Sequence, residues 1–334
     1  MDDLQFGKRN KRGDWAPDKR LDIAPFWSRQ PDPVKILKWV PGYFWPWSLF
    51  FFATALLWWR FVIPDTETLK TLSWGWVLRL YLINAVAIAL YYGAFELRLY
   101  WQRAQGTRFK YNGKFPGDQK SDVFWFGSQN IDNAVRTLSI GVGSWTAVEV
   151  GMLWAYANGY APWLGFAEHP VLVGLVFVFV PMLHEAHFYL IHRLIHIPVL
   201  YKWIHSVHHN SVNPSPWSSL SMHPIEALAY FGVMLWHLIL PSNPVLALYQ
   251  LHFAGFGAAG GHIGFDKIEL GEGALDTPAY THYLHHKYFE VNYADGVVPF
   301  DYLFGTWHDG SPEAQARMEA RFAAKRARVN RKAG

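Results

Sequence analysis

Four long apolar runs constrain this chain more than any other feature of its sequence. They cover approximately residues 44–63, 74–95, 138–157 and 171–191. Each is close to the roughly 20 residues that a helix needs to cross a hydrocarbon core of about 30 Å. Composition agrees, because 17% of the residues are charged, whereas an average soluble chain is about a quarter charged. The sequence therefore predicts an all-α integral membrane protein and excludes disorder, collagen and coiled coil.

Two shorter apolar segments follow, at 225–240 and 244–263. Pro241 and Pro244 lie in the turn between them, which predicts a helical hairpin. The hairpin either crosses the bilayer or dips into it, since its first segment is at the short end for a span. We therefore expect four to six transmembrane helices.

Loop charges orient these helices. The N-terminal residues and the loop 98–120 are rich in Lys and Arg, whereas the loop 64–73 contains Asp65, Glu67 and one Lys. By the positive-inside rule, both basic segments lie in the cytoplasm. Four or six crossings return the chain to that side, so we expect a cytoplasmic histidine-rich cap and cytoplasmic termini. The expected location is a bacterial inner membrane or the endoplasmic reticulum.

The chain is thus divided into four segments. Residues 1–42 form a basic, flexible cytoplasmic tail, and 43–168 form transmembrane helices and a basic loop. Residues 169–310 hold the histidine-rich region, and 311–334 form a basic, helix-compatible C-terminal tail, either solvated or attracted to anionic headgroups. The basic residues of this tail are Arg317, Arg321, Lys325, Arg326, Arg328, Arg331 and Lys332.

Histidine is the residue type that carries the chemistry. The chain contains no cysteine, which excludes thiolate metal sites, iron–sulfur clusters and disulfides. Of its 16 histidines, 14 lie between His184 and His286. Any metal site must therefore use imidazole and carboxylate ligands from this region.

The first histidine group lies at the end of the fourth apolar run. On a helix, Glu185, Tyr189, His192 and His196 share one face. His192 and His196 are spaced to bind one metal from successive turns, with Glu185 either a ligand or a hydrogen-bond acceptor for an imidazole. His184 and His187 point away from this face, which favours packing roles.

The pattern His-x-x-His-His then occurs twice, a repetition that chance makes improbable. The two copies are His205, His208, His209 and His282, His285, His286. The three histidines of one copy cannot all face one point on a helix, but adjacent histidines can diverge toward two neighbouring metals. Eight imidazoles also exceed what one tetrahedral zinc uses. The spacing predicts a dinuclear centre.

The remaining histidines separate into three kinds. His223 precedes Pro224 and Glu226, so capping of a helix and metal ligation are evenly balanced. His262 ends the apolar hairpin, and ligation is favoured over packing. His237 and His252 are expected to pack between helices. His169 and His308 lie outside the cluster.

These motifs resemble the histidine boxes of the fatty acid hydroxylase and sterol desaturase superfamily of membrane di-iron proteins. The resemblance covers approximately residues 171–306. It includes Tyr189-x-x-His192-Arg193, His223-Pro-x-Glu226, His262-x-Gly-Phe-Asp266, Asn292-Tyr293 and Phe300-Asp301-x-x-Phe304-Gly305-Thr306. The chain departs from the family at Glu185, where many members carry Asp, and at Leu190, where an aromatic residue is common.

The resemblance implies a ligand set and a reaction. Two iron ions with O2 as co-substrate would hydroxylate or desaturate a lipid, which is a sterol, another isoprenoid or a fatty acyl chain. The implied metal ligands are His192, His196, His205, His208, His209, His223, His262, His282, His285 and His286. Glu185, Tyr189, Asp266 and Asn292 are the other implied site residues.

Two of these site residues have expected contacts. Glu185 lies two helical turns before His192, and Asp266 lies four residues after His262. We expect both carboxylates to hold an imidazole ring by its second nitrogen rather than to bridge the metals. For Asp266 this requires the helix to continue past Gly264.

The chain has no Rossmann fingerprint, CxxC motif or haem-attachment motif. A separate electron donor is therefore expected, such as a cytochrome b5-like protein, a ferredoxin or a reductase. We expect no nucleic-acid partner, and the sequence leaves the oligomeric state open.

Two other classes compete with an enzyme. A histidine-lined metal or haem transporter would place its ligands in broken helices at mid-membrane. A membrane interaction protein would carry histidines without catalysis. Here the boxes adjoin basic, polar sequence such as Arg193, Lys202 and Lys287, which favours the enzyme.

Overall fold

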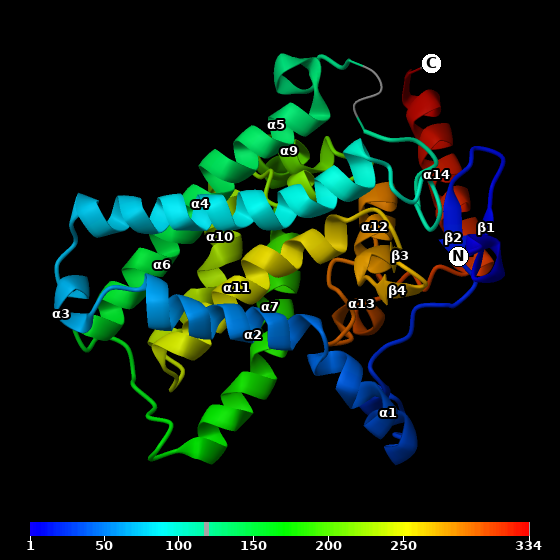
Figure 1. Ribbon diagram of the computed structural model, residues 1–334. Helices are drawn as coiled ribbons and strands as arrows, with labels where there is room; N and C mark the ends of the chain where they lie inside the picture. Colours follow the sequence, from blue (N-terminus) through cyan, green and yellow to red (C-terminus); the bar gives the residue numbers. More distant parts are fainter. Residues whose placement is uncertain (117–119, 334) are drawn as a thin grey trace.

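The computed structural model describes residues 1–116 and 120–333, and it is mostly helical (Figure 1). Residues 117–119 of the expected basic loop, Gly334 and the side chain of Lys332 lie outside this description. The helices are α1 (Pro33–Phe44), α2 (Trp47–Leu57), α3 (Thr66–Leu69), α4 (Trp74–Glu96), α5 (Gln129–Arg136), α6 (Val142–Ala157), α7 (Pro170–Ile195), α8 (Pro198–Leu200), α9 (Ser206–His209), α10 (Pro224–Phe231), α11 (Pro244–His262), α12 (Ala279–Tyr288), α13 (Phe300–Leu303) and α14 (Pro312–Ala333). Single π-helical turns extend four of them, at Trp58–Val62, Leu97–Trp101, Thr137–Gly141 and Tyr201–His205.

Within the described residues, three helical stretches are long and apolar enough to cross a membrane. They are Pro33–Val62, Trp74–Trp101 and Pro170–Ile195. The run at 138–157 forms α6, most of whose side chains are buried inside the helical bundle. The expected hairpin forms α10, a 3-10 turn at Gly232–Leu238 and α11. Three expected spans thus meet this criterion, and the total of four to six remains a prediction.

Helix α6 carries a buried acid, Glu149, which is hydrogen-bonded inside the bundle. Glu149 accepts a hydrogen bond from the Asn84 amide at 2.6 Å, and Asn84 in turn accepts one from the Trp58 indole at 3.0 Å. This polar chain links α2, α4 and α6 and gives one Glu149 oxygen a partner away from water. The sequence alone had left the role of Glu149 open.

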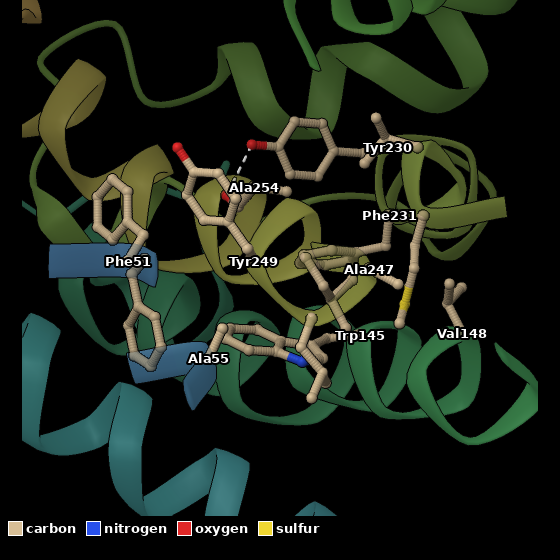
Figure 2. Packing of buried hydrophobic residues seen from close by; sticks show 14 of the residues in the cluster. Phe51, Ala55, Trp145, Val148, Tyr230, Phe231, Ala247, Tyr249 and Ala254 are labelled. Atoms are coloured by element: carbon tan, nitrogen blue, oxygen red, sulfur yellow. Dashed lines mark hydrogen bonds between the residues drawn. The ribbon is translucent and has the colours of Figure 1, made fainter. Parts of the chain in front are cut away.

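The main core lies where α2, α6, α10 and α11 meet (Figure 2). Trp145 of α6 lies directly against α11 because that helix has glycine at position 255. A Cβ atom at Gly255 would lie 2.0 Å from the Trp145 ring, so any larger residue would separate the two helices. The Gly255 carbonyl also accepts a hydrogen bond from Tyr92 of α4 at 2.6 Å. This close packing fixes α11, which ends at the histidine region.

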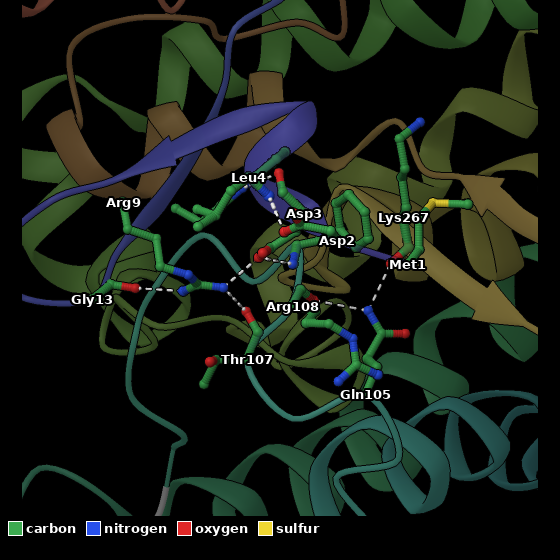
Figure 3. Close-up of polar contacts among 12 residues, drawn as sticks. Met1, Asp2, Asp3, Leu4, Arg9, Gly13, Gln105, Thr107, Arg108 and Lys267 are labelled. Carbon is green, nitrogen blue, oxygen red and sulfur yellow. Dashed lines mark hydrogen bonds and ion pairs between the residues drawn. The ribbon is translucent and has the colours of Figure 1, made fainter.

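The first 17 residues are folded, which differs from the flexible tail expected for them. Strands β1 (Gly7–Arg9) and β2 (Trp15–Pro17) form an antiparallel hairpin. Trp15 is fully buried, with its ring 5.5 Å from that of Phe109. Arg9 pairs with Asp3 and donates to the Thr107 carbonyl at 2.7 Å (Figure 3). The N-terminal segment is polar on average, but the buried Trp15 and the ion pair between Arg9 and Asp3 hold it against the rest of the protein.

The C-terminal residues form the long helix α14, as their composition allows. Its first turns are docked, with Ala314 and Met318 buried and Arg321 paired with Glu290 at 2.8 Å. A second hairpin, β3 (Lys267–Leu270) with β4 (Gly273–Asp276), lies between α11 and α12 in the chain. Both termini lie on the same side of the molecule (Figure 1).

Candidate metal centre

Nine histidines from the three boxes and the end of α11 converge in two adjacent groups. The five-histidine group contains His192, His196, His205, His209 and His285, and the four-histidine group contains His208, His262, His282 and His286. Within each group the candidate ligand atoms all lie within 4.8 Å of one another. The groups adjoin, since the rings of His209 and His286 are 4.7 Å apart.

Helix geometry explains how each His-x-x-His-His unit divides between the groups. Residues four apart on a helix are separated by about 40° around the axis, and the residue three along lies about 60° to the other side. Accordingly, His205 and His209 enter one group while His208 enters the other. In α12 the same rule sends His282 and His286 to one group and His285 to the other. Each repeat therefore contributes to two metal positions.

Hydrogen bonds to backbone carbonyl groups fix the rings of three of these histidines. The Nδ1 atoms of His192, His262 and His285 donate to the carbonyl oxygens of Tyr293, Ala258 and Val291 at 2.8, 2.9 and 2.7 Å. A carbonyl only accepts, so each Nδ1 carries the proton and each Nε2 keeps its lone pair. The three lone pairs are therefore free to bind a metal.

The inward-facing nitrogens are spaced as ligands of shared metals. Six Nε2 to Nε2 distances, such as those of His192 to His205 and of His209 to His285, lie between 3.0 and 3.3 Å. Metal–imidazole bonds of about 2.1 Å place neighbouring ligand nitrogens roughly 3.0 to 3.4 Å apart. Facing lone pairs repel unless a cation lies between them. The donor sets therefore fit two metal ions.

The protein also keeps these imidazoles neutral. Eight of the nine are buried, and His196 is partly exposed. Burial lowers the pKa of His205, His209, His282, His285 and His286 well below the ordinary value, and neighbouring imidazoles lower it further. Neutral imidazole is the form that binds metal.

Glu226 is a site residue that sequence reasoning did not include. Its Oε1 atom lies 2.7 Å from the Nδ1 atom of His205, and both side chains are buried. A carboxylate in this position orients the ring and leaves Nε2 pointing into the five-histidine group. Glu226 lies in the first turn of α10, three residues after His223. The sequence showed the spacing of Glu226 from His223, but it did not show that Glu226 contacts His205.

Glu185 and Tyr189 lie on the same face of α7 as His192, but Glu185 does not make the contact expected for it. The carboxylate of Glu185 accepts hydrogen bonds from the backbone N–H groups of Gly296 and Val298 at 2.5 and 2.8 Å. It therefore holds the loop after α12 rather than an imidazole ring. The buried ring of Tyr189 stacks on Phe300 at 5.0 Å.

Asp266 and Asn292 join neither histidine group. Helix α11 ends at His262 because Gly264 adopts a φ of +74°, so Asp266 is not one turn away from His262. Its carboxylate accepts from the Tyr111 hydroxyl at 3.1 Å instead. Asn292 joins two chain segments, since its amide donates to the His308 carbonyl at 3.0 Å and its Oδ1 accepts from the His308 N–H at 2.8 Å.

The loop that carries Tyr293 is further held by Asp301. Its two carboxylate oxygens accept from the N–H groups of Tyr293 and Ala294 at 3.0 and 2.8 Å. Because the Tyr293 carbonyl orients His192, Asp301 supports the metal centre indirectly. The Phe300-Asp301 motif was recognised in the sequence, but not this role.

The other histidines belong to neither of the two groups. His223 caps α10, where its Nδ1 accepts from the Ile225 N–H at 3.2 Å. His187 contacts the Ala229 carbonyl at 2.7 Å, and His252 contacts Thr54 at 2.9 Å, which is the interhelical packing expected for it. Of the ten histidines implied as ligands, nine come together and His223 does not.

Comparison with known proteins identifies the region that holds the centre. The sequence model of the fatty acid hydroxylase family matches residues 177–306, which include all nine converging histidines. Residues 177–306 are thus similar to the fatty acid hydroxylase family. The resemblance inferred from the histidine boxes is thus confirmed.

Individual members of the superfamily are similar over different lengths. A Delta(7)-sterol 5(6)-desaturase of Aspergillus fumigatus is 27% identical over 263 residues, covering 71% of this chain and 76% of the relative. Enzymes with the same description from Gibberella zeae and Candida glabrata are 31% and 26% identical, covering 40% and 59% of this chain. The chain spans 41% and 53% of these two relatives, about half of their length. No solved structure matches this chain.

A cavity of about 280 Å³ leads to the metal centre. Five of the converging histidines reach its wall, and aromatic side chains form much of the rest, including Trp39, Trp47, Phe51, Phe188 and Phe253. These aromatic residues come from α1, α2, α7 and α11. A mostly apolar cavity with a few polar groups is typical of a small-molecule site. The candidate metal centre therefore faces an apolar ligand space.

Proposed function

We propose that this protein is a membrane-bound non-haem di-iron oxidoreductase that uses O2 to hydroxylate or desaturate a lipid. One observation carries the proposal: nine imidazoles form two adjacent ligand groups at the wall of an apolar cavity. The family match and relatives described as sterol desaturases support the lipid substrate.

The donor set favours iron. Imidazole nitrogen suits iron better than magnesium or calcium, which prefer oxygen ligands. Held by the five-histidine and four-histidine groups, two irons would supply an oxidant able to remove hydrogen from an unactivated C–H bond. The chain's own residues keep the ligand lone pairs unprotonated, orient the rings and exclude bulk water from the cavity.

The apolar cavity is suited to a substrate drawn from the bilayer. Trp47 and Phe51 belong to a candidate membrane-spanning stretch, and Phe188 belongs to another. A sterol, another isoprenoid or an acyl chain would place its C–H bonds against the histidine wall. Hydroxylation and desaturation begin with the same hydrogen abstraction, so the cavity serves either outcome.

Electrons would come from a separate donor on the cytoplasmic side, either a cytochrome b5-like protein, a ferredoxin or a reductase. The proposed topology is multi-pass, with the metal centre and both termini in the cytoplasm. A tag at either end should be protected from an impermeant reagent added to intact cells. Labelling of either tag before permeabilisation would contradict this orientation.

The position of the ligands argues against a metal or haem transporter. His192 lies in the last turn of α7, and His196 is its C-terminal cap. Most of α7 precedes them, so the ligands lie at one end of this candidate span rather than at its middle. A transporter site is expected near the middle of the membrane.

Lipid profiling tests the proposal directly. Lipids would be compared between cells that express the protein, cells that lack it and cells that express His286→Ala. We expect a hydroxylated or further unsaturated lipid that requires the parent protein and O2. An unchanged lipid profile, together with purified protein that holds iron but oxidises no sterol or acyl lipid in the presence of O2 and a reductase, would contradict it.

A further inference from the structure

One carboxylate in the cavity takes no part in the metal centre. Asp295 lies in the loop between α12 and α13, and its side chain faces the cavity. The side chain is exposed, and it forms part of the cavity wall. Among the described residues, no hydrogen bond or ion pair engages it, whereas the other cavity carboxylate, Glu226, contacts His205.

The loop that carries Asp295 is held in place from two sides. Glu185 accepts from the N–H groups of Gly296 and Val298, as described above. The indole of Trp27 donates to the Val297 carbonyl at 2.8 Å. These contacts fix the backbone after Asp295, and Asp301 fixes it before Asp295 by accepting from the N–H groups of Tyr293 and Ala294. This indicates a built position rather than a loop side chain that happens to point inward.

The charge around Asp295 restricts what it can bind. Desolvation, with a smaller contribution from Asp301, raises the pKa of Asp295 to about 6, so most of the population remains ionised at neutral pH. An ionised carboxylate only accepts hydrogen bonds. Asp301 adds further negative charge nearby. This end of the cavity therefore disfavours an anionic group.

We infer that Asp295 accepts a hydrogen bond from a hydroxyl group on the lipid substrate, so that the cavity selects a lipid alcohol over a free fatty acid. The inference rests on the proposed function, because it takes the cavity to be the substrate site. The shared chemistry is a neutral hydroxyl donor on an apolar body. A sterol alcohol and a long-chain alcohol both supply it.

The position of Asp295 also indicates which end of the substrate is oxidised. Asp295 is two residues from Tyr293, whose carbonyl holds His192, and two residues of extended chain span at most roughly 7 Å. The hydroxyl group would thus be bound close to the metal ligands. Oxidation is expected in the part of the lipid next to the hydroxyl group, not at the far end of its tail.

Ligand binding without turnover tests this subsite. Detergent-purified protein would be saturated with tritiated cholesterol, and displacement would be measured with cholesterol, cholesteryl methyl ether, octadecanol and octadecanoic acid. In the parent protein each alcohol should compete better than its ether or acid counterpart. A lost hydrogen bond to a charged group corresponds to roughly 10- to 100-fold in affinity, which is the loss expected for cholesterol in Asp295→Leu.

Two further variants make the result decisive. Asp295→Asn keeps the size and one acceptor oxygen but removes the charge, so octadecanoic acid should compete better than in the parent. Asp22→Asn, which changes an exposed aspartate outside the cavity, should bind as the parent does. Competition by the sterol alone or by the long-chain alcohol alone would identify the source of the hydroxyl group and support the subsite.

Two outcomes would overturn the inference. One is equal competition by alcohol, ether and acid in the parent protein. The other is an alcohol preference that persists unchanged in folded Asp295→Leu. If that variant does not fold, the corresponding outcome is that octadecanoic acid competes equally well in Asp295→Asn and in the parent. A failure of the proposed function looks different, because the alcohol preference would be present while no lipid is oxidised with iron, O2 and a reductase.

Discussion

The five-histidine group and the four-histidine group use the same side chain but differ in what holds it. In the five-histidine group, His192, His205 and His285 are oriented by acceptors from two segments outside the group: the Tyr293 and Val291 carbonyls of the loop after α12, and Glu226 of α10. In the four-histidine group, His262 is held by its own helix at Ala258. Within the described chain the Nδ1 atom of His286 is buried without a partner, as is that of His209 in the five-histidine group.

This difference teaches how the two metal positions depend on the fold. The five-histidine group is organised by tertiary contacts before any metal binds. It also contains one more candidate ligand than the four-histidine group. The four-histidine group depends more on its own members and on the metal. We therefore expect the four-histidine position to be the weaker of the two.

The largest effect should come from removing a ligand of the four-histidine group. His286→Ala leaves three imidazoles there, so iron content should fall from about two to about one per chain, and turnover should stop. His209→Ala leaves four imidazoles in its group and should retain more iron, although turnover should also stop because both metals are required. Iron analysis of the purified variants checks this.

His169→Ala is the matched control for both variants. His169 is the residue before α7 and lies outside both groups, so its loss should leave iron and turnover in place. Turnover that survives the loss of His209 or His286 would show that the site is not the proposed centre. Equal iron loss in the two ligand variants would remove the difference between the groups.

Glu226 tests the external support of the five-histidine group. Glu226→Ala removes the acceptor that orients His205, and loss of such a partner typically costs about 10- to 100-fold in metal affinity or activity. Glu226→Gln keeps one acceptor oxygen and should recover part of the loss. Competition with a chelator measures the affinity, with the exposed Glu67→Gln as control. An unchanged affinity in Glu226→Ala would mean that the ring needs no outside support.

Glu185 should affect metal binding less than Glu226, since it holds the loop of Asp295 and not an imidazole. Glu185→Gln keeps an acceptor for one of the two backbone N–H groups. We expect it to retain iron and measurable turnover, with weaker binding of cholesterol. Iron analysis beside the displacement assay separates these effects. A stably folded Glu185→Gln protein without iron, under conditions that load the parent, would make this carboxylate a ligand.

The smallest effect is expected for His223. His223→Ala removes one hydrogen bond at the start of α10, and a lost N-terminal cap costs about 0.5 to 2 kcal/mol of stability. Iron content and turnover should match the parent, while thermal unfolding in detergent shifts slightly downward. Loss of one iron from this variant would place His223 among the ligands after all.

Local periodicity made much of this molecule predictable. The helices α4 and α7 and the division of each His-x-x-His-His unit follow from helix geometry, which depends on residues three and four apart. The apolar runs also located three candidate spans, although burial of α6 inside the bundle could not be read from hydropathy.

Tertiary approach and backbone breaks account for what the sequence did not predict. Glu226 reaches His205 only because α10 packs beside the segment 201–209, a contact that no spacing encodes. Asp266 is displaced from His262 because Gly264 takes a left-handed conformation and ends α11. The N-terminal hairpin depends on the burial of Trp15 against Phe109, which an average over a polar segment conceals.

The metal content of the parent protein tests the central claim most directly. Detergent-purified protein would be stripped of metal, loaded with Fe(II) without oxygen, desalted and analysed for iron per chain. Two ligand groups predict about two irons per folded chain. A folded parent protein that binds one iron or none under these conditions would contradict a di-iron centre.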